Sequence, residues 1–392
     1  MKAIVFGAGK IARGFIGHLL YLNRIPFVFV DVNTQLVSLL KERKNYRVYV
    51  MGNPERNGLI QDFDATELSD VHAVAREWSA ADIAFISVGG KNLASLAEAL
   101  AEAFVIRCME YKVDSPIHMI VCENWKKPAD LLRQEIRNRL PGVCTEAFDR
   151  WVGIAESAVM RSGVEPTESM LNGDPLCVRV SDYWELPVDR EALPGEPARI
   201  EGIRYIDQFA GFLERKFYTY NAANGTVSYL GYLRGHESLY DAAIDPEIVK
   251  VLDGVYRETG EALVRKYGIL PQEQKAFALS SRKKLQDPGI VDFVERNARD
   301  PIRKLGPDDR LVGSARLVQE YGGEPEGVAT AIAAALYYDH PQDPSAKQLK
   351  SLREEKGIDW ILASVCRIAE DERLALLIKD KVFELKRKGW IS

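Results

Sequence analysis

The chain has 392 residues, which is long enough for two or three domains that each bury a core. Hydrophobic residues make up 46% and charged residues 28%, so the composition excludes an intrinsically disordered chain. Because 52 Lys and Arg residues face 57 Asp and Glu residues, the net charge of -5 argues against nucleic acid or a membrane surface as a partner.

Targeting and metal-binding signals are weak. The longest apolar stretch, residues 328–338, is much shorter than the roughly 20 residues that span a bilayer, and the apolar run after Lys2 is too short for a signal peptide. The five cysteines are widely spaced without a C-x-x-C pair, and the five histidines are too few and scattered for a His-rich site. We expect a cytoplasmic protein with reduced thiols and no metal.

The first half of the chain alternates short apolar runs with helical stretches. This alternation predicts a parallel sheet with helices on both faces. The expected strands are Lys2–Phe6, Pro26–Val30, Asp82–Val88, Ile117–Cys122 and Val152–Val159.

A glycine-rich turn follows the first expected strand. Gly7-Ala8-Gly9-Lys10-Ile11-Ala12 has the form G-x-G-x-x-A and opens an apolar helix, the context of a dinucleotide-binding loop. Asp31 ends the second strand 22 residues after Gly9, where a carboxylate accepts hydrogen bonds from an adenosine ribose. That carboxylate would repel a 2′-phosphate, so we predict NAD rather than NADP, held by Gly7, Gly9, Lys10, Ile11 and Asp31. The alternative is a simple turn, with Asp31 capping the next helix.

Two later strands end in polar or glycine-rich segments. Ser87-Val88-Gly89-Gly90 and Cys122-Glu123-Asn124 should lie at the carboxyl edge, where open sheets bind ligands. We assign Val88, Gly89 and Asn124 to the cofactor site, and Asn124 also to the substrate. Asn124 is equally well explained as a strand-end turn former.

The pattern changes after a Pro- and Gly-bearing segment, Leu186–Gly202, which we interpret as a domain boundary. Long helical stretches follow, for example Ile206–Tyr220, Pro246–Tyr267 and Val328–Tyr338. The predicted fold is a doubly wound Rossmann domain over residues 1–190 that binds NAD, followed by a mostly helical substrate and catalytic domain over residues 191–392.

Lys216 lies among aromatic residues in the first of these helical stretches. At 100° per residue Asn221 lies 140° and Asn224 80° around the helix from Lys216, so the three share one broad face. A lysine whose pKa is lowered by burial can take a hydroxyl proton, and amides can hold the reacting oxygen. Without further context, a solvated helix face explains the same residues.

Several separated motifs together resemble the polyol-specific long-chain dehydrogenase family, in particular its mannitol-1-phosphate dehydrogenases. The resemblance covers nearly the whole chain. It implies a Rossmann domain followed by a helical domain, with Lys216 as general base and Asn221 holding the reacting oxygen. The motifs are Gly7 to Phe15, Asp31-Val32-Asn33, Cys122-Glu123-Asn124, Lys216-x4-Asn221, Tyr229 to His236, Arg296, Arg303-Lys304-Leu305 and Asp309-Arg310-Leu311.

The chain departs from the family pattern at three substrate positions. Asn224 stands where the family has histidine, Met160 where it usually has an acid, and Lys284 where a substrate-binding arginine is frequent. An amide can orient a hydroxyl but cannot titrate near neutral pH. His236 belongs to a Gly-His pair that the family has in addition to the missing histidine, so it is no replacement.

The expected reaction is NAD-dependent interconversion of a sugar alcohol, such as the hexitol phosphate mannitol 1-phosphate, and its ketose. Lys284, Arg303 and Lys304 are assigned to the substrate, and Arg303, Lys304 and Arg310 suggest an anionic group on it, unless they form a solvated loop. The alternatives are a related keto-uronate reductase and a nucleotide-binding homologue impaired by Asn224. We expect a monomer or small homo-oligomer.

Overall fold

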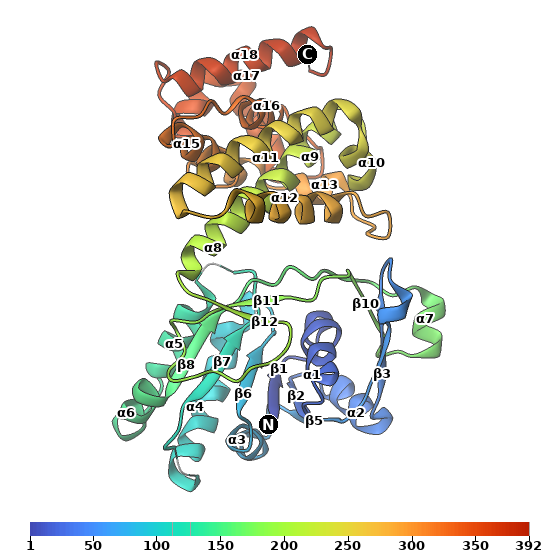
Figure 1. The fold of residues 1–392 in the computed structure, drawn as a ribbon, viewed down its shortest axis with the longest axis vertical. Coiled ribbons are helices and arrows are strands. Elements are labelled where there is room, and N and C mark those ends of the chain that lie inside the picture. Colours follow the sequence, from blue (N-terminus) through green and yellow to red (C-terminus); the bar gives the residue numbers. More distant parts are fainter. Residues whose placement is uncertain (112, 126, 392) are drawn as a thin grey trace. The chain divides into compact units, whose positions relative to one another are not determined.

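The computed structural model describes residues 1–111, 113–125 and 127–391. The chain forms two compact units, Met1–Phe209 and Ala210–Ser392. The first unit contains the strands and the second is helical (Figure 1). The boundary expected after residue 190 falls inside the first unit.

The first unit is built on a parallel sheet in the order β5-β2-β1-β6-β7-β8. β1 pairs with β2 on one side and β6 on the other, so the strand order reverses at β1, as in doubly wound Rossmann folds. The predicted fold class is confirmed, and all five expected strands are present. The sheet strands are β1 (Ala3–Phe6), β2 (Phe27–Asp31), β5 (Phe63–Glu67), β6 (Ile83–Ile86), β7 (Ile117–Val121) and β8 (Val152–Glu156).

Alternate residues of β1 enter apolar clusters on opposite faces of this sheet. Ala3 and Val5 pack with the helix after the glycine turn and with α2, whereas Ile4 and Phe6 pack with α3 to α6. Both faces are therefore covered, which explains why the central strands read as continuous apolar runs. The helices are η1 (Ala12–Gly17), α1 (His18–Leu22), α2 (Thr34–Arg43), α3 (Val71–Ser79), η3 (Gly90–Asn92), α4 (Leu93–Glu110), α5 (Pro128–Arg137) and α6 (Gly142–Trp151).

Two smaller sheets complete this unit. One has the order β4-β3-β10-β9, and the other pairs β11 with β12. The segment interpreted as a boundary thus contains a strand, and its buried Leu193 and Ile200 join the core of the first unit. The elements are β3 (Tyr46–Val50), η2 (Pro54–Arg56), β4 (Gly58–Ile60), β9 (Gly163–Val164), α7 (Glu168–Gly173), β10 (Val178–Val180), β11 (Leu186–Asp189) and β12 (Ile203–Ile206).

The second unit packs its helices around α16, which is almost entirely buried. A Cβ on Gly327 would lie 2.8 Å from the backbone nitrogen of Val255, so glycine permits α16 to approach α11 closely. The helical elements are α8 (Phe209–Lys216), η4 (Phe217–Asn221), α9 (Ala222–Leu233), α10 (Leu239–Ile244), α11 (Pro246–Tyr267), α12 (Pro271–Leu285), α13 (Val294–Ala298), α14 (Pro301–Lys304), α15 (Val312–Glu320), α16 (Glu326–Leu336), α17 (Pro344–Ser364) and α18 (Arg373–Arg387).

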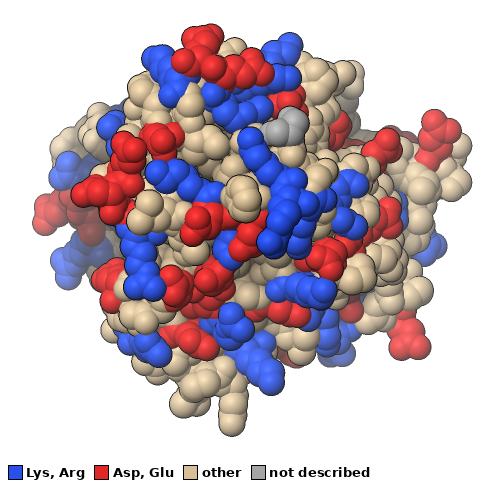
Figure 2. Space-filling model, turned by 90° about the horizontal axis from the view of Figure 1, so that it is seen from above, with Lys and Arg blue, Asp and Glu red and all other residues tan. Residues whose placement is uncertain are grey.

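The surface carries mixed charge. Figure 2 shows Lys and Arg interspersed with Asp and Glu on the face that it presents, without one broad basic surface of the kind that tracks a nucleic-acid backbone. Within the described residues, none of the helices combines the length and apolar character that crossing a membrane requires.

Candidate active site

The glycine turn after β1 lies at the point where the strand order reverses. Gly7 has φ +95°, and a Cβ there would lie 2.1 Å from the carbonyl oxygen of Ser87 at the end of β6. Around Gly9, in contrast, a Cβ would meet no atom within 4 Å. Gly7 is therefore required by the close approach of two backbones, whereas Gly9 leaves open space above the loop. That space suits the pyrophosphate of a dinucleotide, which contacts backbone at this turn.

The peptide of Ala8 inside this turn is held from both sides. Its N–H donates to Oδ2 of Asp31 at 2.6 Å, and its carbonyl accepts a hydrogen bond from the buried guanidinium of Arg13. Oδ1 of Asp31 also accepts the N–H of Asn33 at 2.9 Å. A carboxylate has about four acceptor positions, so two remain for ribose hydroxyls.

Asp31 does not cap the next helix, which was the alternative to ribose binding. The N-cap of α2 is Asn33, whose side chain accepts the N–H of Leu36 at 3.0 Å. Lys10 forms an ion pair with Glu165, so its ammonium has a protein partner here.

The other predicted cofactor residues follow β6 and β7. Gly89, with φ +88°, donates its N–H to Oε1 of Glu123 at 2.6 Å, which ties the ends of the two strands together next to Val88. Burial raises the pKa of Glu123. Asn124 follows, with Nδ2 3.4 Å from the carbonyl oxygen of Val159. Sequence reasoning assigned no role to Glu123, although it stands beside Asn124 in the same motif.

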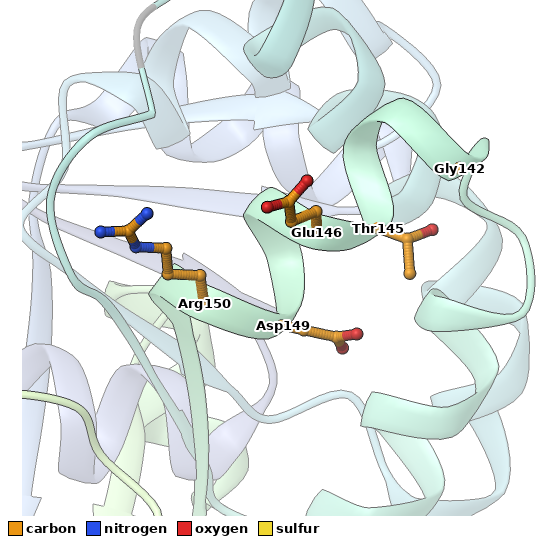
Figure 3. Close-up of a pocket in the computed structure, with 5 residues that line it drawn as sticks. All are labelled: Gly142, Thr145, Glu146, Asp149 and Arg150. Carbon is orange, nitrogen blue, oxygen red and sulfur yellow. The ribbon is translucent and has the colours of Figure 1, made fainter.

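One surface cavity of the first unit lies elsewhere. It has a volume of about 670 Å³ and is lined by residues of α6, including Thr145, Glu146 and Asp149. In Figure 3 the labelled side chains point in different directions, and none of them belongs to the predicted site. Because α6 leads directly into the amino end of β8, this cavity is not at the carboxyl edge.

In the second unit, the predicted catalytic residues lie on a helix with irregular geometry. The residues Phe217–Asn221 form a π-helical turn, in which Ala222 donates its N–H to the carbonyl of Phe217 five residues earlier. In such a turn the fifth residue takes the place that the fourth has in an α-helix. Lys216 and Asn221 therefore lie closer to one line than the expected 140°, and Asn224 lies three residues further on the same face.

Lys216 is only partly exposed, and burial together with the charge of Arg310 lowers its pKa. Lys284 is its neighbour, because burial and the charge of Lys216 lower the pKa of Lys284 to about 8. These like charges favour a neutral Lys216, the form that can accept a proton.

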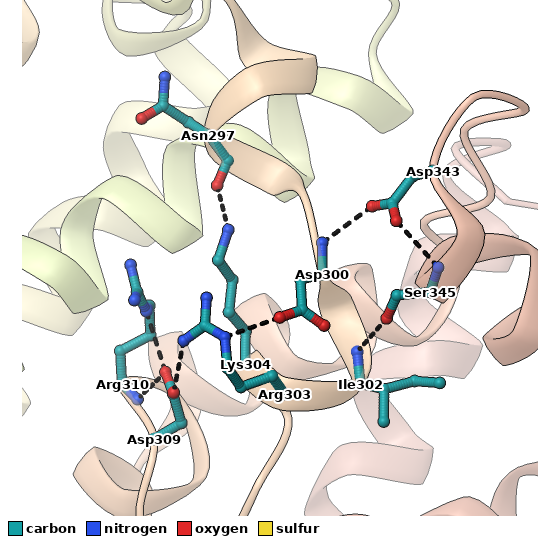
Figure 4. A network of polar contacts seen from close by, with 9 residues as sticks. All are labelled: Asn297, Asp300, Ile302, Arg303, Lys304, Asp309, Arg310, Asp343 and Ser345. Carbon is teal, nitrogen blue, oxygen red and sulfur yellow. Dashed lines mark hydrogen bonds and ion pairs between the residues drawn. The ribbon is translucent and has the colours of Figure 1, made fainter. Parts of the chain in front are cut away.

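Three further cations gather between α13 and α15, where Figure 4 shows them side by side. Arg303 and Arg310 share the carboxylate of Asp309, at 3.2 and 3.0 Å. Lys304 is buried, with 5% exposed, and burial followed by the charges of Arg310 and Arg303 lowers its pKa to about 7. Arg303 also pairs with Asp300 at 2.7 Å. The cluster keeps an excess of positive charge.

Asn224 is connected to this cluster through Asn297 on α13. Nδ2 of Asn224 donates to Oδ1 of Asn297 at 3.1 Å, and Nζ of Lys304 donates to the backbone carbonyl of Asn297 at 2.5 Å. Sequence reasoning missed Asn297, because nothing in its local sequence relates it to a residue 73 positions earlier.

His236 has a structural environment. Its Nε2 lies 2.8 Å from Oδ2 of Asp245, the N-cap of α11, and Arg234 donates to the same oxygen at 2.6 Å. Among the residues that the structure describes, no group of three His, Cys, Asp or Glu side chains is arranged to hold a metal ion.

Family models match both units. The model of the mannitol dehydrogenase Rossmann domain matches residues 1–202, and that of the mannitol dehydrogenase C-terminal domain matches residues 208–385. The chain belongs to the mannitol dehydrogenase family. The resemblance inferred from the motifs is thereby confirmed.

Individual family members are similar over almost the full length. A mannitol-1-phosphate 5-dehydrogenase of Bacillus licheniformis is 36% identical over 382 residues, covering 96% of this chain and 98% of that protein. The fold resembles a substrate-free D-sorbitol dehydrogenase, with TM-score 0.81, 14% identity and coverage of 100% of this chain and 94% of that one. It also resembles Pseudomonas fluorescens mannitol 2-dehydrogenase, solved with NAD and D-mannitol, with TM-score 0.71, 14% identity and coverage of 100% and 92%.

Proposed function

We propose that this member of the mannitol dehydrogenase family interconverts a hexitol phosphate and the corresponding ketose phosphate with NAD. The observation that carries the proposal is the helix face on which Lys216, with its lowered pKa, lies beside two amides. The mannitol-1-phosphate 5-dehydrogenase relatives support the substrate class.

The residues of the first unit fit a dinucleotide. The open space at Gly9 receives the pyrophosphate, the remaining acceptor positions of Asp31 bind the adenosine ribose, and Val88, Gly89 and Asn124 contact the nicotinamide half. When bound, the nicotinamide supplies the acceptor for the hydride.

In the direction of oxidation, the neutral amine of Lys216 takes the proton of the substrate hydroxyl as the hydride leaves the same carbon. Asn221 donates to the oxygen as it gains negative charge, and Asn224 orients the substrate. One alcohol and one oxidised nicotinamide become one ketone, one reduced nicotinamide and one proton, which Lys216 releases to solvent.

The phosphate is assigned to the cation cluster. Arg303 and Arg310 offer planar N–H pairs that suit phosphate oxygens, and the ammonium of Lys304 adds a charge. Lys284, beside Lys216, contacts a hydroxyl near the reacting carbon. An unphosphorylated hexitol would leave the positive charge of this cluster unmatched.

The pH dependence should report Lys304. Its ammonium is charged below its pKa of about 7 and neutral above it, whereas a phosphate monoester is mostly dianionic above about pH 6. We expect the ratio of kcat/KM for a hexitol phosphate to kcat/KM for the free hexitol to fall as the pH rises through about 7, because Lys216 affects both substrates alike. Lys304→Met should lower and flatten this ratio. A wild-type ratio that rises over the same interval would contradict the assignment.

Asp31 should determine the choice of cofactor. Asp31→Ala removes charge-assisted bonds worth about 1.5–3 kcal/mol and releases Ala8, so NAD should bind about 10 to 100 times more weakly in calorimetric titration. Asp31→Asn, which keeps one side-chain oxygen, should lose less. Tighter binding of NADP than of NAD by the wild type would show that the role given to Asp31 is wrong.

A substrate panel tests the proposal as a whole. Phosphorylated and free hexitols and keto-uronates are assayed by nicotinamide absorbance in both directions. Turnover of hexitol phosphates above the others is the expected result. Turnover of keto-uronates alone would favour the related reductase, and tight NAD binding without any turnover would favour a nucleotide-binding homologue.

The proposal extends to the setting of the reaction. All five cysteines are free thiols, which suits the reducing cytoplasm. The substrate site of a monomer or of each subunit in a small homo-oligomer would serve equally.

A further inference from the structure

Asn297 makes a distinct hydrogen bond with each of its three side-chain and backbone polar groups in the second unit. Its Nδ2 donates to the carbonyl of Phe293 at 2.9 Å, its Oδ1 accepts from Asn224 at 3.1 Å, and its backbone carbonyl accepts from Lys304 at 2.5 Å. Asn297 is partly exposed, so its environment is accessible to a ligand. One side chain of α13 thereby connects a predicted hydroxyl contact on α9 with a predicted phosphate contact on α14.

These contacts fix the orientation of two amides. If the Asn297 amide were turned over, its oxygen would face the carbonyl oxygen of Phe293, and two acceptors would repel each other. Oδ1 of Asn297 must therefore face Asn224, and Asn224 must present its Nδ2 to it. The oxygen of Asn224 is then directed away from Asn297 and serves as an acceptor.

We propose that Asn297 is a positioning residue that sets the amide of Asn224 so that its Oδ1 accepts a hydrogen bond from a substrate hydroxyl. This inference rests on the proposed function and extends it by one residue outside the sequence motifs. An unsupported amide would interchange its oxygen and nitrogen ends at little cost, and half of its orientations would place a donor where the hydroxyl needs an acceptor. Orientation by Asn297 removes this ambiguity without a titrating group.

A double-mutant cycle isolates this coupling. Asn297→Leu removes the acceptor at similar volume and should lower kcat/KM for the hexitol phosphate about tenfold in the wild-type background. In the Asn224→Ala background the same change should cost less than about twofold, because no amide remains to be oriented. Equal losses in both backgrounds would overturn the proposal, since Asn297 would then act through Lys304 or the fold.

A control on the same helix separates positioning from damage to α13. Glu295 is half exposed and forms an ion pair with His340, and an exposed pair contributes at most about 1 kcal/mol. Glu295→Leu should leave kcat/KM within about twofold of wild type and shift the melting temperature as little as Asn297→Leu does. A loss of activity equal to that of Asn297→Leu would assign the effect to the helix and contradict positioning.

A second measurement does not require turnover, so that failure of this inference can be told from failure of the proposed function. In protein labelled with ¹⁵N-asparagine, the Nδ2 signals of Asn224 are assigned by their disappearance in Asn224→Ala. We expect two well-separated proton signals with slowed exchange in wild type, which merge toward the values of free amides in Asn297→Leu. Signals unchanged by Asn297→Leu would overturn the inference, whatever the substrate panel shows.

Discussion

Lys216→Ala should abolish turnover while NAD affinity stays nearly unchanged. Removing a positioned general base costs about 10² to 10⁴ in rate, and Lys216 lies in the helical unit, whereas the predicted nucleotide contacts lie in the Rossmann unit. Its lowered pKa means that much of the lysine is in the form that accepts a proton, which alanine cannot replace. The measurement is kcat with a hexitol phosphate, paired with calorimetric titration of NAD.

Two further lysine variants make this test specific. Lys216→Arg keeps a positive charge but cannot deprotonate near neutral pH, so it should be as inactive as the alanine variant. Lys250 is 73% exposed on α11 and pairs with Glu247, so Lys250→Ala should retain wild-type turnover. Robust activity in Lys216→Ala would refute the assignment of the base.

Gly7→Ala is expected to destroy the nucleotide site and destabilise the Rossmann unit. Its φ of +95° disfavours any side chain, and the added Cβ would lie 2.1 Å from the carbonyl oxygen of Ser87, which belongs to backbone and cannot move freely. Backbone strain and overpacking each cost on the order of 1–3 kcal/mol. Thermal unfolding should show the lowered melting temperature, and calorimetry should show no NAD binding at concentrations that saturate the wild type.

Gly9→Ala is the matched comparison, because its Cβ would enter open space. We expect the melting temperature to remain close to that of wild type while NAD binding weakens by about 10-fold or more, since the methyl group occupies space that the pyrophosphate needs. If Gly9→Ala bound NAD normally, the position of the pyrophosphate over this loop would have to be revised.

Local sequence was sufficient for the centre of the Rossmann sheet. Strand β1, the glycine turn and Asp31 follow one another within a single β-α-β segment, so their spacing alone indicated their arrangement. β5 was missed because it is an edge strand in which only some residues are buried, and Phe63 to Glu67 therefore lacks a continuous apolar run. β10 was missed because it pairs with β3, more than 120 residues earlier, through three residues only.

The candidate site shows the same division. Lys216, Asn221 and Asn224 were recognised because they lie within nine residues of one helix, although the π-helical turn that aligns them has no signal in a regular 100° wheel. The cations near residue 303 were visible as a charged run. The link from Asn224 to Lys304 was invisible, because it depends on Asn297 and on the packing of α13 against α9.

The clamp on the Ala8 peptide has a consequence for how fast the nucleotide is captured. Asp31 and Arg13 hold this peptide without help from a ligand, so the loop already has the shape in which we expect it to receive the pyrophosphate. Little backbone freedom remains to be lost on association, and the free energy of the new contacts is not spent on ordering the loop. The encounter with NAD should therefore proceed as a single bimolecular step, limited by orientation rather than by a preceding rearrangement.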